Sequence, residues 1–354
     1  MTPRRPRAAA VAALALALLA GHAPAARGAD LVLHETGSTL LYPLFERWIP
    51  AYAAAHPGVA ITAAATGSGA GIEQALAGQV QIGASDAYMS DDQAERHRGV
   101  LNIPLAIAAL TVNYNLPGLG GALRLDGPTL AGIYAGTVTM WDAPEIAAQN
   151  PGLHLPHQPI VPLRRADASG DTFVFTQFLD FSTKQWDDGV GYGTEVAWPA
   201  VPAARAASGN AGLLHLLATT PYALAYLGIS FHDAVDKAGL GTALLKNQDG
   251  QYLLPTAATV AAGAASLDRR TPPDERLSLV YAPGAQSYPL VNYEYAVVPA
   301  HQPDPATAAA LRHFLLWAIA VDGGNAPSFL DAVRFIALPD FIRAMSERQI
   351  ATIR

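Results

Sequence analysis

The segment IVPLRRADASGDTFVF, residues 160–175, combines a strand pattern, a short polar loop and a helical pattern. Residues 160–163 form a mainly apolar run, which is typical of a buried strand. Beyond the loop, apolar side chains recur at the spacing of one helix face, at Val174, Phe175, Phe178 and Leu179. Ser169 and Gly170 lie between the two patterns, where small residues permit a tight change of direction. The segment therefore predicts a strand followed at once by a helix, the repeating unit of an α/β fold.

Two further segments have the same organisation. Thr36-Gly37-Ser38-Thr39 precedes a helical pattern over 41–55, and Gly67-Ser68-Gly69-Ala70-Gly71 precedes another over 71–77. Elsewhere, strand-like runs occupy 32–33, 59–62, 103–112, 223–229 and 290–298, and helical patterns occupy 129–135, 172–181, 306–320 and 327–335. Because the two kinds of run alternate along the chain, the whole sequence predicts an α/β protein.

The composition limits the class of protein. The chain has 354 residues, which suggests two domains at about 100–200 residues each. Hydrophobic residues make up 51% and charged residues 14%, which excludes intrinsic disorder. The formal net charge of −7 argues against a nucleic-acid-binding protein, which would carry an excess of basic residues. Cysteine is absent, which excludes disulfides, thiolate metal sites, cysteine nucleophiles and lipid attachment through cysteine.

The first residues have the pattern of an export signal. Residues 1–7 carry three arginines and no acid, residues 8–20 are apolar, and Ala23-Pro24-Ala25 is a small-x-small cleavage site. A membrane span needs about 20 apolar residues, so this run is too short to be an anchor. His22 stands where a lipoprotein signal would place the lipidated cysteine. We therefore expect residues 1–25 to be a cleaved signal peptide and the exported protein to have no lipid anchor and not to be embedded in a membrane.

The three serine-glycine segments share a design that suits an anion. Free N–H groups at the start of a helix point outward, and the helix dipole favours negative charge there. The hydroxyls of Thr39, Ser68 and Ser169 add donors, and Arg165 adds a planar guanidinium with a full positive charge. Any one such segment is ordinarily a helix cap. Three of them, one with an arginine, favour an oxyanion site if the fold brings them together.

These segments resemble the motifs of a known family. The similar stretches are GSTLLYP at 37–43, GSGAG at 67–71, GASD at 83–86 and RADASGDTF at 165–173. They are similar to the periplasmic phosphate-binding proteins of Pst-type ABC transporters, which are type II periplasmic binding proteins. Shorter similarities lie at 112–118, 139–142 and 291–295. The resemblance extends over essentially the whole chain after the signal, in the same order.

The resemblance implies a two-lobed periplasmic-binding-protein fold with a ligand cleft between the lobes. The chain would cross between lobes near 112–116 and near 288–293. Lobe I would comprise 26–112 and 286–354, and lobe II would comprise 113–285. The implied function is high-affinity binding of inorganic phosphate in the periplasm and its delivery to the transmembrane subunits of an ABC permease. We expect a monomer that uses no cofactor.

The resemblance also assigns the phosphate contacts. Lobe I would contribute Ser38, Thr39, Leu40, Ser68 and Asp86, and lobe II would contribute Arg165, Ser169, Gly170 and Asp171. The hydroxyls of Thr39, Ser68 and Ser169 would donate hydrogen bonds to phosphate, as would the backbone N–H groups of Leu40 and Gly170. Asp167 would orient Arg165 without touching the ligand.

Asp86 would affect which anion the site binds. An ionised aspartate only accepts hydrogen bonds, so it repels an anion that has no proton to donate. Phosphate near neutral pH carries one or two protons, whereas sulfate carries none. Breaking a buried charge pair costs on the order of 3–5 kcal/mol, and about 4 kcal/mol corresponds to roughly a thousandfold in affinity. Asp86 therefore predicts selection of phosphate over sulfate; the plainer alternative is an aspartate that caps a turn.

Position 171 departs from a common form of the family motif, in which threonine follows Ser-Gly. Asp171 has two interpretations. It can cap a helix near the positive end of the helix dipole, where aspartate is favoured. Alternatively, it is a second carboxylate acceptor, which would favour the more protonated form of phosphate. The sequence leaves both open.

A phosphatase-like hydrolase is the competing class of function. It would need a serine nucleophile with a nearby base, yet none of the ten histidines lies in the three segments. The chain also lacks a Gly-x-Ser-x-Gly elbow, a P-loop lysine and a His-Glu-x-x-His motif. These absences favour a binding protein over an enzyme.

Two other interpretations are weaker. A binding protein for sulfate, molybdate or another oxyanion would have no use for Asp86. His154 and His157 have a spacing that binds metal on a helix, but the prolines around them argue against a helix. We therefore expect no metal site.

Overall fold

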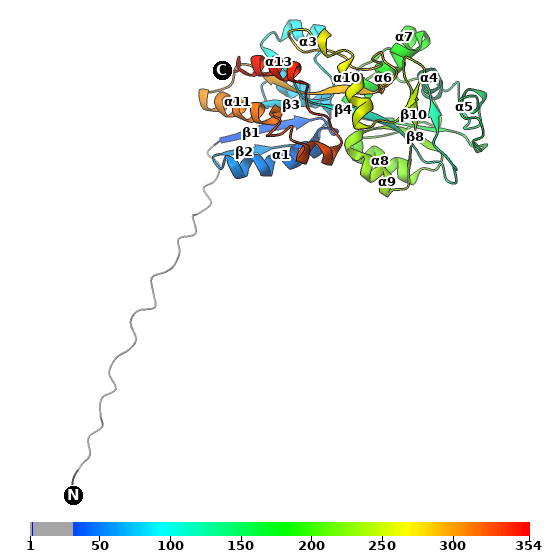
Figure 1. The fold of residues 1–354 in the computed structure, drawn as a ribbon, viewed down its shortest axis with the longest axis horizontal. Coiled ribbons are helices and arrows are strands. Elements are labelled where there is room, and N and C mark those ends of the chain that lie inside the picture. The colour runs from blue at the N-terminus through cyan, green and yellow to red at the C-terminus, as the bar shows by residue number, and fades with distance from the viewer. Residues whose placement is uncertain (1, 3–30) are drawn as a thin grey trace.

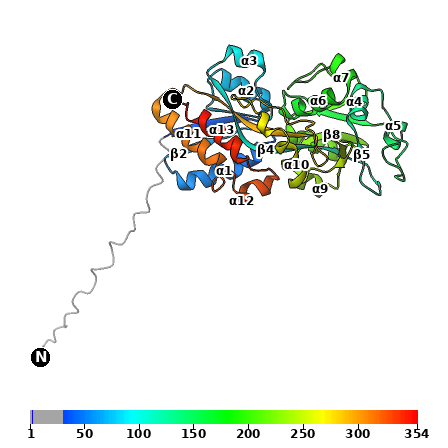
Figure 2. The same cartoon turned by 45° about the horizontal axis from the view of Figure 1, so that its top comes forward.

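The computed structural model describes Thr2 and residues 31–354 of the chain (Figure 1). The signal-peptide prediction for 1–25 thus falls on residues that, apart from Thr2, lie outside the described ones. The described chain forms two lobes side by side, and both views show the first and last elements in one lobe and the middle of the chain in the other (Figure 1, Figure 2). No helix within 31–354 is long and apolar enough to span a membrane.

Helices and strands alternate along most of the chain, as the sequence predicts. The strands are β1 (Leu31–Gly37), β2 (Val59–Thr62), β3 (Ile82–Ser85), β4 (Val100–Tyr114), β5 (Arg124–Leu125), β6 (Val161–Arg165), β7 (Arg205–Ala207), β8 (Ala223–Gly228), β9 (Gly241–Thr242), β10 (Leu244–Lys246), β11 (Tyr252–Leu253) and β12 (Val291–Pro299). The helices are α1 (Tyr42–Ala55), α2 (Ser68–Leu76), α3 (Asp91–Arg96), α4 (Gly127–Ala135), α5 (Pro144–Ala147), α6 (Gly170–Ser182), α7 (Lys184–Gly189), α8 (Gly209–Thr219), α9 (His232–Lys237), α10 (Ala257–Ala265), α11 (Pro305–Ile319), α12 (Pro327–Leu330) and α13 (Asp340–Ile350). Short 3₁₀ turns occupy Ile229–Phe231, Asp268–Arg270 and Asp331–Val333.

One mixed sheet runs through both lobes in the order β2-β1-β3-β12-β4-β8-β6-β7, and β9 pairs with β4. Strand β1 is parallel to β2 and β3, and β6 is parallel to β7 and β8. Strand β12 runs antiparallel to both β3 and β4. A small second sheet has the order β11-β10-β5. Parallel strands end at the same edge of a sheet, so the loops after β1 and β3 lie together.

Strand β4 belongs to both lobes. Its first part, Val100–Ala109, pairs with β12, and its last part, Leu110–Tyr114, pairs with β8. The exchange of partners at Leu110 is therefore where the sheet passes from one lobe to the other. The return passage begins at β12, because Leu290 accepts a hydrogen bond from the Leu110 N–H and Val291 pairs with Ala109.

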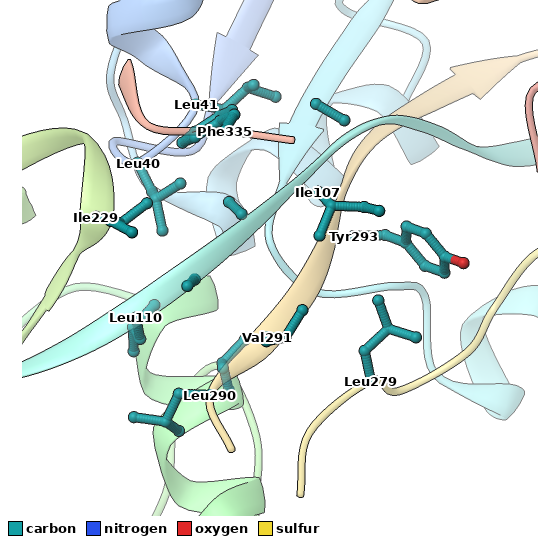
Figure 3. Packing of buried hydrophobic residues seen from close by; sticks show 14 of the residues in the cluster. Leu40, Leu41, Ile107, Leu110, Ile229, Leu279, Leu290, Val291, Tyr293 and Phe335 are labelled. Atoms are coloured by element: carbon teal, nitrogen blue, oxygen red, sulfur yellow. The ribbon is translucent and has the colours of Figure 1, made fainter. Parts of the chain in front are cut away.

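The core is continuous across the lobe boundary. Leu40 from the first lobe lies beside Ile229 from the second, next to β4 and in the same buried cluster as Leu110 (Figure 3). Away from the boundary, an aromatic cluster in the first lobe contains Phe45, Trp48, Tyr52, Phe314 and Trp317. Fully burying one large apolar side chain stabilises the fold by about 1.5–3 kcal/mol. Each lobe is thus a well-packed body, and the contact between them is itself apolar.

Most predicted elements are confirmed within one or two residues, including the helices over 41–55, 129–135 and 306–320. The strand predicted over 32–33 is longer, because β1 pairs with β2 along its first half and with β3 along its second. The single helix predicted over 327–335 is wrong in its second half. There α12 ends at Leu330, and Arg334 has a left-handed φ of 59°, a conformation that no α-helix continues through.

Candidate functional site

The three serine-glycine segments come together at the boundary between the lobes. Gly37 ends β1, and its register partner Ala84 lies on β3, two residues before Asp86. Arg165 ends β6 in the second lobe, and the loop after it reaches back: the Gly69 N–H donates to the Ala168 carbonyl at 3.0 Å. The convergence that the sequence could only suggest is therefore present.

The glycines are required by this close approach. A Cβ atom at Gly37 would lie 2.0 Å from the Ala84 carbonyl oxygen, and Gly37 and Gly67 have φ values of 142° and 96°. A Cβ at Gly170 would lie 2.5 Å from both Asp86 Oδ2 and Ser68 Oγ. Only glycine has no Cβ to place there, so the lobes meet across a gap that any side chain at position 170 would fill.

Asp86 lies at the centre of the first-lobe half of the site, with 2% of its surface exposed. Its carboxylate accepts hydrogen bonds from the hydroxyls of Ser38 and Ser68, the latter at 3.2 Å. The Ser38 oxygen in turn accepts from the N–H groups of Leu40 and Leu41 at 3.1 and 2.9 Å. Burial raises the pKa of Asp86 above its ordinary value, while the neighbouring Glu294 carboxyl, the Ser38 hydroxyl and the charge of Arg165 oppose the rise. These contacts hold the Asp86 carboxylate in one orientation.

Arg165 is the basic side chain of the second-lobe half. It is 3% exposed, and its guanidinium contacts Asp167, with Nε to Oδ1 at 2.8 Å, and Asp171. Burial alone would lower the pKa of Arg165, but the charges of Asp171 and Asp167 outweigh it, so the guanidinium stays charged. The predicted orienting role of Asp167 is consistent with this geometry, and Asp167 also accepts from the Gly209 N–H at 3.0 Å.

Asp171 lies in the first turn of α6, but Ser169 is the residue that caps this helix. The Ser169 hydroxyl accepts from the Thr172 N–H at 3.4 Å. Asp171 is fully buried, and its Oδ2 accepts from Arg165 and from Asn210 Nδ2, the latter at 2.7 Å. Within the described residues its Oδ1 has no hydrogen-bond partner. Asp171 therefore does not provide the side-chain cap of α6, and one of its two carboxylate oxygens is left unpartnered among the described residues.

Several N–H groups at the site are not used within the described protein and are available as donors. Within residues 31–354, the backbone N–H groups of Thr39, Gly170 and Asp171 donate to no protein acceptor. Two of the five guanidinium N–H groups of Arg165 are likewise not used by the acids beside it. The site thus offers converging donors together with the buried acceptor Asp86, an arrangement that suits an anion that itself carries a proton.

Asn210 is a site residue that the sequence analysis missed. It is fully buried at the start of α8, and its Nδ2 donates to Thr39 Oγ1 at 2.9 Å and to Asp171 Oδ2 at 2.7 Å. Its own Oδ1 accepts from the Gly228 N–H at 2.9 Å. A signal was present, since Ser208-Gly209-Asn210 is a fourth serine-glycine segment that opens a helix.

Glu294 is the second residue that was missed. It lies in the middle of β12 with no exposed surface, close to the Asp86 carboxyl. The signal for it was the one acidic residue inside the run 290–298, which apart from Asn292 is otherwise apolar and aromatic.

Comparison with known proteins places this arrangement in a family. The model of the PBP superfamily domain matches residues 21–321. The Phosphate-binding protein PstS of Xylella fastidiosa is 32% identical over 79% of this chain and 75% of its own length. The Phosphate-binding protein PstS of Methanocaldococcus jannaschii is 29% identical over 92% of this chain and 87% of its own. The chain belongs to the PstS family.

A solved structure of another protein, named as a phosphate-binding protein, shares the fold. The phosphate-binding protein from Stenotrophomonas maltophilia superposes with a TM-score of 0.70 over 90% of this chain and 93% of its own, at 19% identity. The family assignment confirms the resemblance on which the two-lobed fold was predicted. Both of the relatives compared above are named as phosphate-binding proteins.

The features expected of the competing functions were also sought. No histidine in the described part of the chain hydrogen-bonds to Ser38, Ser68 or Ser169. No group of three or more His, Cys, Asp or Glu side chains within 31–354 is arranged to hold a metal ion. His157 pairs instead with Asp142, Nδ1 to Oδ2 at 2.8 Å.

Proposed function

We propose that this protein binds inorganic phosphate between its lobes and delivers it to an ABC-type permease for import. The observation that supports this most is the convergence, in one buried space, of three helix-start segments with Arg165 on one side and Asp86 on the other. The donors suit the phosphate oxygens, and the acceptor suits a P–OH group. The PstS relatives, named as phosphate-binding proteins, support the same ligand.

The donors divide into backbone and side-chain groups. The N–H group of Gly170, the hydroxyls of Thr39 and Ser169, and two N–H groups of Arg165 would donate to phosphate. The Leu40 N–H would donate as well if it turned from Ser38 Oγ, which it reaches at 3.1 Å in this structure. Ser68 would turn its single proton from Asp86 to the ligand, since its 3.2 Å contact with Asp86 is long for a hydroxyl donor. Ser38, held by two N–H groups and Asp86, would act mainly by positioning Asp86.

The carboxylate acceptors, Asp86 and Asp171, would determine which anion binds. Ionised Asp86 can accept the proton of a P–OH group but would face a bare oxygen of sulfate. Asp171 would be a second acceptor through its Oδ1. Burial and the nearby charge of Asp86 raise the pKa of Asp171 to about 7. Two acceptors would favour phosphate that carries two protons over phosphate that carries one.

The cellular setting follows from the family and the leader sequence. Residues 1–25 would be removed on export, which leaves a monomer in the periplasm without a lipid anchor. Lobe I would comprise 26–112 and 286–354, and lobe II would comprise 113–285. The protein would act as a carrier and not as an enzyme, because the cradle contains serines without a histidine base.

A thermal-shift screen against phosphate, sulfate, arsenate and molybdate tests the ligand. A ligand that binds only the folded state raises the melting temperature. We expect phosphate to give a large rise at micromolar concentration and sulfate to give none. A rise in melting temperature with sulfate or molybdate alone would mean that the protein binds that oxyanion instead of phosphate. Hydrolysis of a chromogenic phosphoester that is lost in Ser68→Ala or Ser169→Ala would favour the hydrolase.

A further inference from the structure

Glu294 is a buried acid that the phosphate contacts above do not use. It has no exposed surface, and no lysine, arginine or histidine of the described chain lies within ion-pair distance of it. Its Oε1 accepts from Asn292 Nδ2 at 2.8 Å. Its Oε2 is buried without any donor among the described residues. A buried carboxylate oxygen in that position is costly if it is ionised.

The acid that acts most strongly on this carboxyl is Asp86. The same Asn292 Nδ2 also reaches the Asp86 backbone carbonyl, at 3.3 Å, so one amide links the two acids. β12 meets β3 just before Asp86, since Tyr295 pairs with Ser85, and its pairing with β4 shifts between Glu294 and Tyr295. One residue beyond the last β12–β3 pair, the same antiparallel register places Glu294 opposite Asp86.

The other charged groups around the pair do not neutralise Glu294. Asp86 and, further away, Asp171 face it, and both are acids. Arg165 is engaged by Asp167 and Asp171. Strand β4 and helix α10, which pack on β12, contain no Asp, Glu, Lys, Arg or His, and Glu73 of α2 is exposed.

Two buried acids side by side cannot both be ionised without strong repulsion. One proton shared by the pair removes the repulsion and supplies the donor that Glu294 Oε2 lacks. Burial, then the charge of Asp86, raise the pKa of Glu294 well above its ordinary value. Asp86 is the better place for the negative charge, because Ser38, Ser68 and the field of Arg165 stabilise it there.

We propose that Glu294 is a protonated positioning residue that donates a carboxyl hydrogen bond to Asp86, keeps Asp86 ionised and thereby sets the preference of the site for a proton-bearing anion. The proposal rests on phosphate binding at this site. It assigns to Glu294 no direct contact with the ligand. It explains why an acidic side chain lies in the core of β12: without its proton donor, Asp86 would take up the proton itself and become a donor that tolerates sulfate.

Two substitutions at one position separate this role from packing. Glu294→Gln keeps the shape and a permanent N–H donor to Asp86, whereas Glu294→Leu keeps the volume but removes the donor. Glu35→Gln is the matched control, because Glu35 on β1 is also a buried glutamate, 3% exposed, with both carboxylate oxygens unpartnered among the described residues.

Phosphate and sulfate affinities are measured by titration calorimetry from pH 6 to 9 on the three variants and the wild type. We expect Glu294→Gln to keep the phosphate-to-sulfate affinity ratio within about threefold and Glu294→Leu to reduce it by at least about tenfold. Affinity for phosphate should fall less steeply with rising pH in Glu294→Gln than in Glu35→Gln or the wild type, because the amide cannot lose its proton. Infrared difference spectra between wild type and each variant should show that Glu294→Gln removes one protonated-carboxyl band and that Glu35→Gln removes a separate one and retains that of Glu294.

The proposal is overturned if Glu294→Gln and Glu294→Leu change the affinity ratio equally, or if the carboxyl band is unaffected by Glu294→Gln. An increase in sulfate affinity in Glu294→Gln alone would also overturn it, because that result requires an ionised Glu294 in the wild type. Absence of phosphate binding by the wild-type protein would instead reject the function on which the proposal rests.

Discussion

Arg165 is the basic side chain within a group of four buried or half-buried acids, Asp86, Asp167, Asp171 and Glu294. Arg165→Ala removes two free donors and leaves the acids uncompensated. We expect the affinity for phosphate to fall by at least about a thousandfold, in line with about 4 kcal/mol for a broken buried charge pair. Titration calorimetry measures the loss, and circular dichroism checks that the variant is folded.

Arg164→Ala is the control for this substitution. Arg164 is the preceding residue on β6, but its guanidinium lies over the Trp198 ring, 5.8 Å from its centre, away from the acids. We expect its phosphate affinity to stay within about threefold of wild type. Near-normal affinity in a folded Arg165→Ala variant would show that the anion binds elsewhere.

Asp86→Asn tests how the site distinguishes phosphate from sulfate. The amide keeps the size of the side chain but can present N–H as well as oxygen, so it no longer repels an unprotonated oxygen. We expect the preference for phosphate over sulfate to shrink by about 100-fold to 1,000-fold, mostly through a gain for sulfate. Both anions are titrated into the same variant, so a general loss of folding would weaken both together. An unchanged ratio would contradict selection by repulsion.

Helix α8 brings its first turn into the site and links the two lobes. Asn210 is bonded to Thr39 from the first lobe and to Asp171 and the Gly228 N–H from the second. Asn210→Ala breaks these bonds: it removes one of the two donors to Asp171 Oδ2 and leaves the buried Gly228 N–H without a partner, which costs about 1–3 kcal/mol. We expect phosphate affinity to fall by about 10-fold to 100-fold, mainly through faster release measured by stopped flow.

Asn115→Ala is the matched control for Asn210. Asn115 donates from its side chain to the Leu217 carbonyl at the other end of α8, within the second lobe. Its loss should lower the melting temperature without changing the release rate. Equal release rates in the two variants would mean that α8 contributes only to stability.

The three serine-glycine segments could be predicted because a strand, a loop and a helix are adjacent in sequence and each pattern is local. Asn210 and Glu294 could not be predicted in the same way. The role of Asn210 depends on α8 lying against β6 and β8, and that of Glu294 on β12 lying beside β3, about 210 residues earlier in the chain. The end of the helix predicted over 327–335 was wrong for a related reason, which is again a contact between distant parts of the chain. Ile336 pairs with Ile107 of β4, so the chain leaves the helical conformation before it reaches this residue.

Stability of the whole molecule should depend on pH through its buried acids. Burial raises the pKa of Glu35 from 4.5 to about 8. The folded chain then holds a proton that the unfolded chain releases, so the contribution of Glu35 to stability is fully present below pH 4.5 and is lost as the pH rises toward 8. We expect the melting temperature of Glu35→Gln to fall less between pH 5 and pH 8 than that of the wild type. Glu46→Gln, an exposed position on α1, should follow the wild type, and equal slopes in all three proteins would contradict the assignment.

We expect closure of the two lobes on phosphate to depend on the narrow approach at Gly170. An alanine in a helix normally stabilises it by about 0.5–1 kcal/mol relative to glycine, but a Cβ at Gly170 would meet Asp86 and Ser68 of the other lobe at 2.5 Å. Gly212→Ala on α8 is the control, because its Cβ would meet nothing closer than 3.6 Å.

We expect small-angle scattering to show compaction on adding phosphate in the wild type and Gly212→Ala. Gly170→Ala should stay open and bind at least about 100-fold more weakly. Wild-type-like compaction of Gly170→Ala would contradict closure through this contact, and identical wild-type curves with and without phosphate would contradict closure altogether.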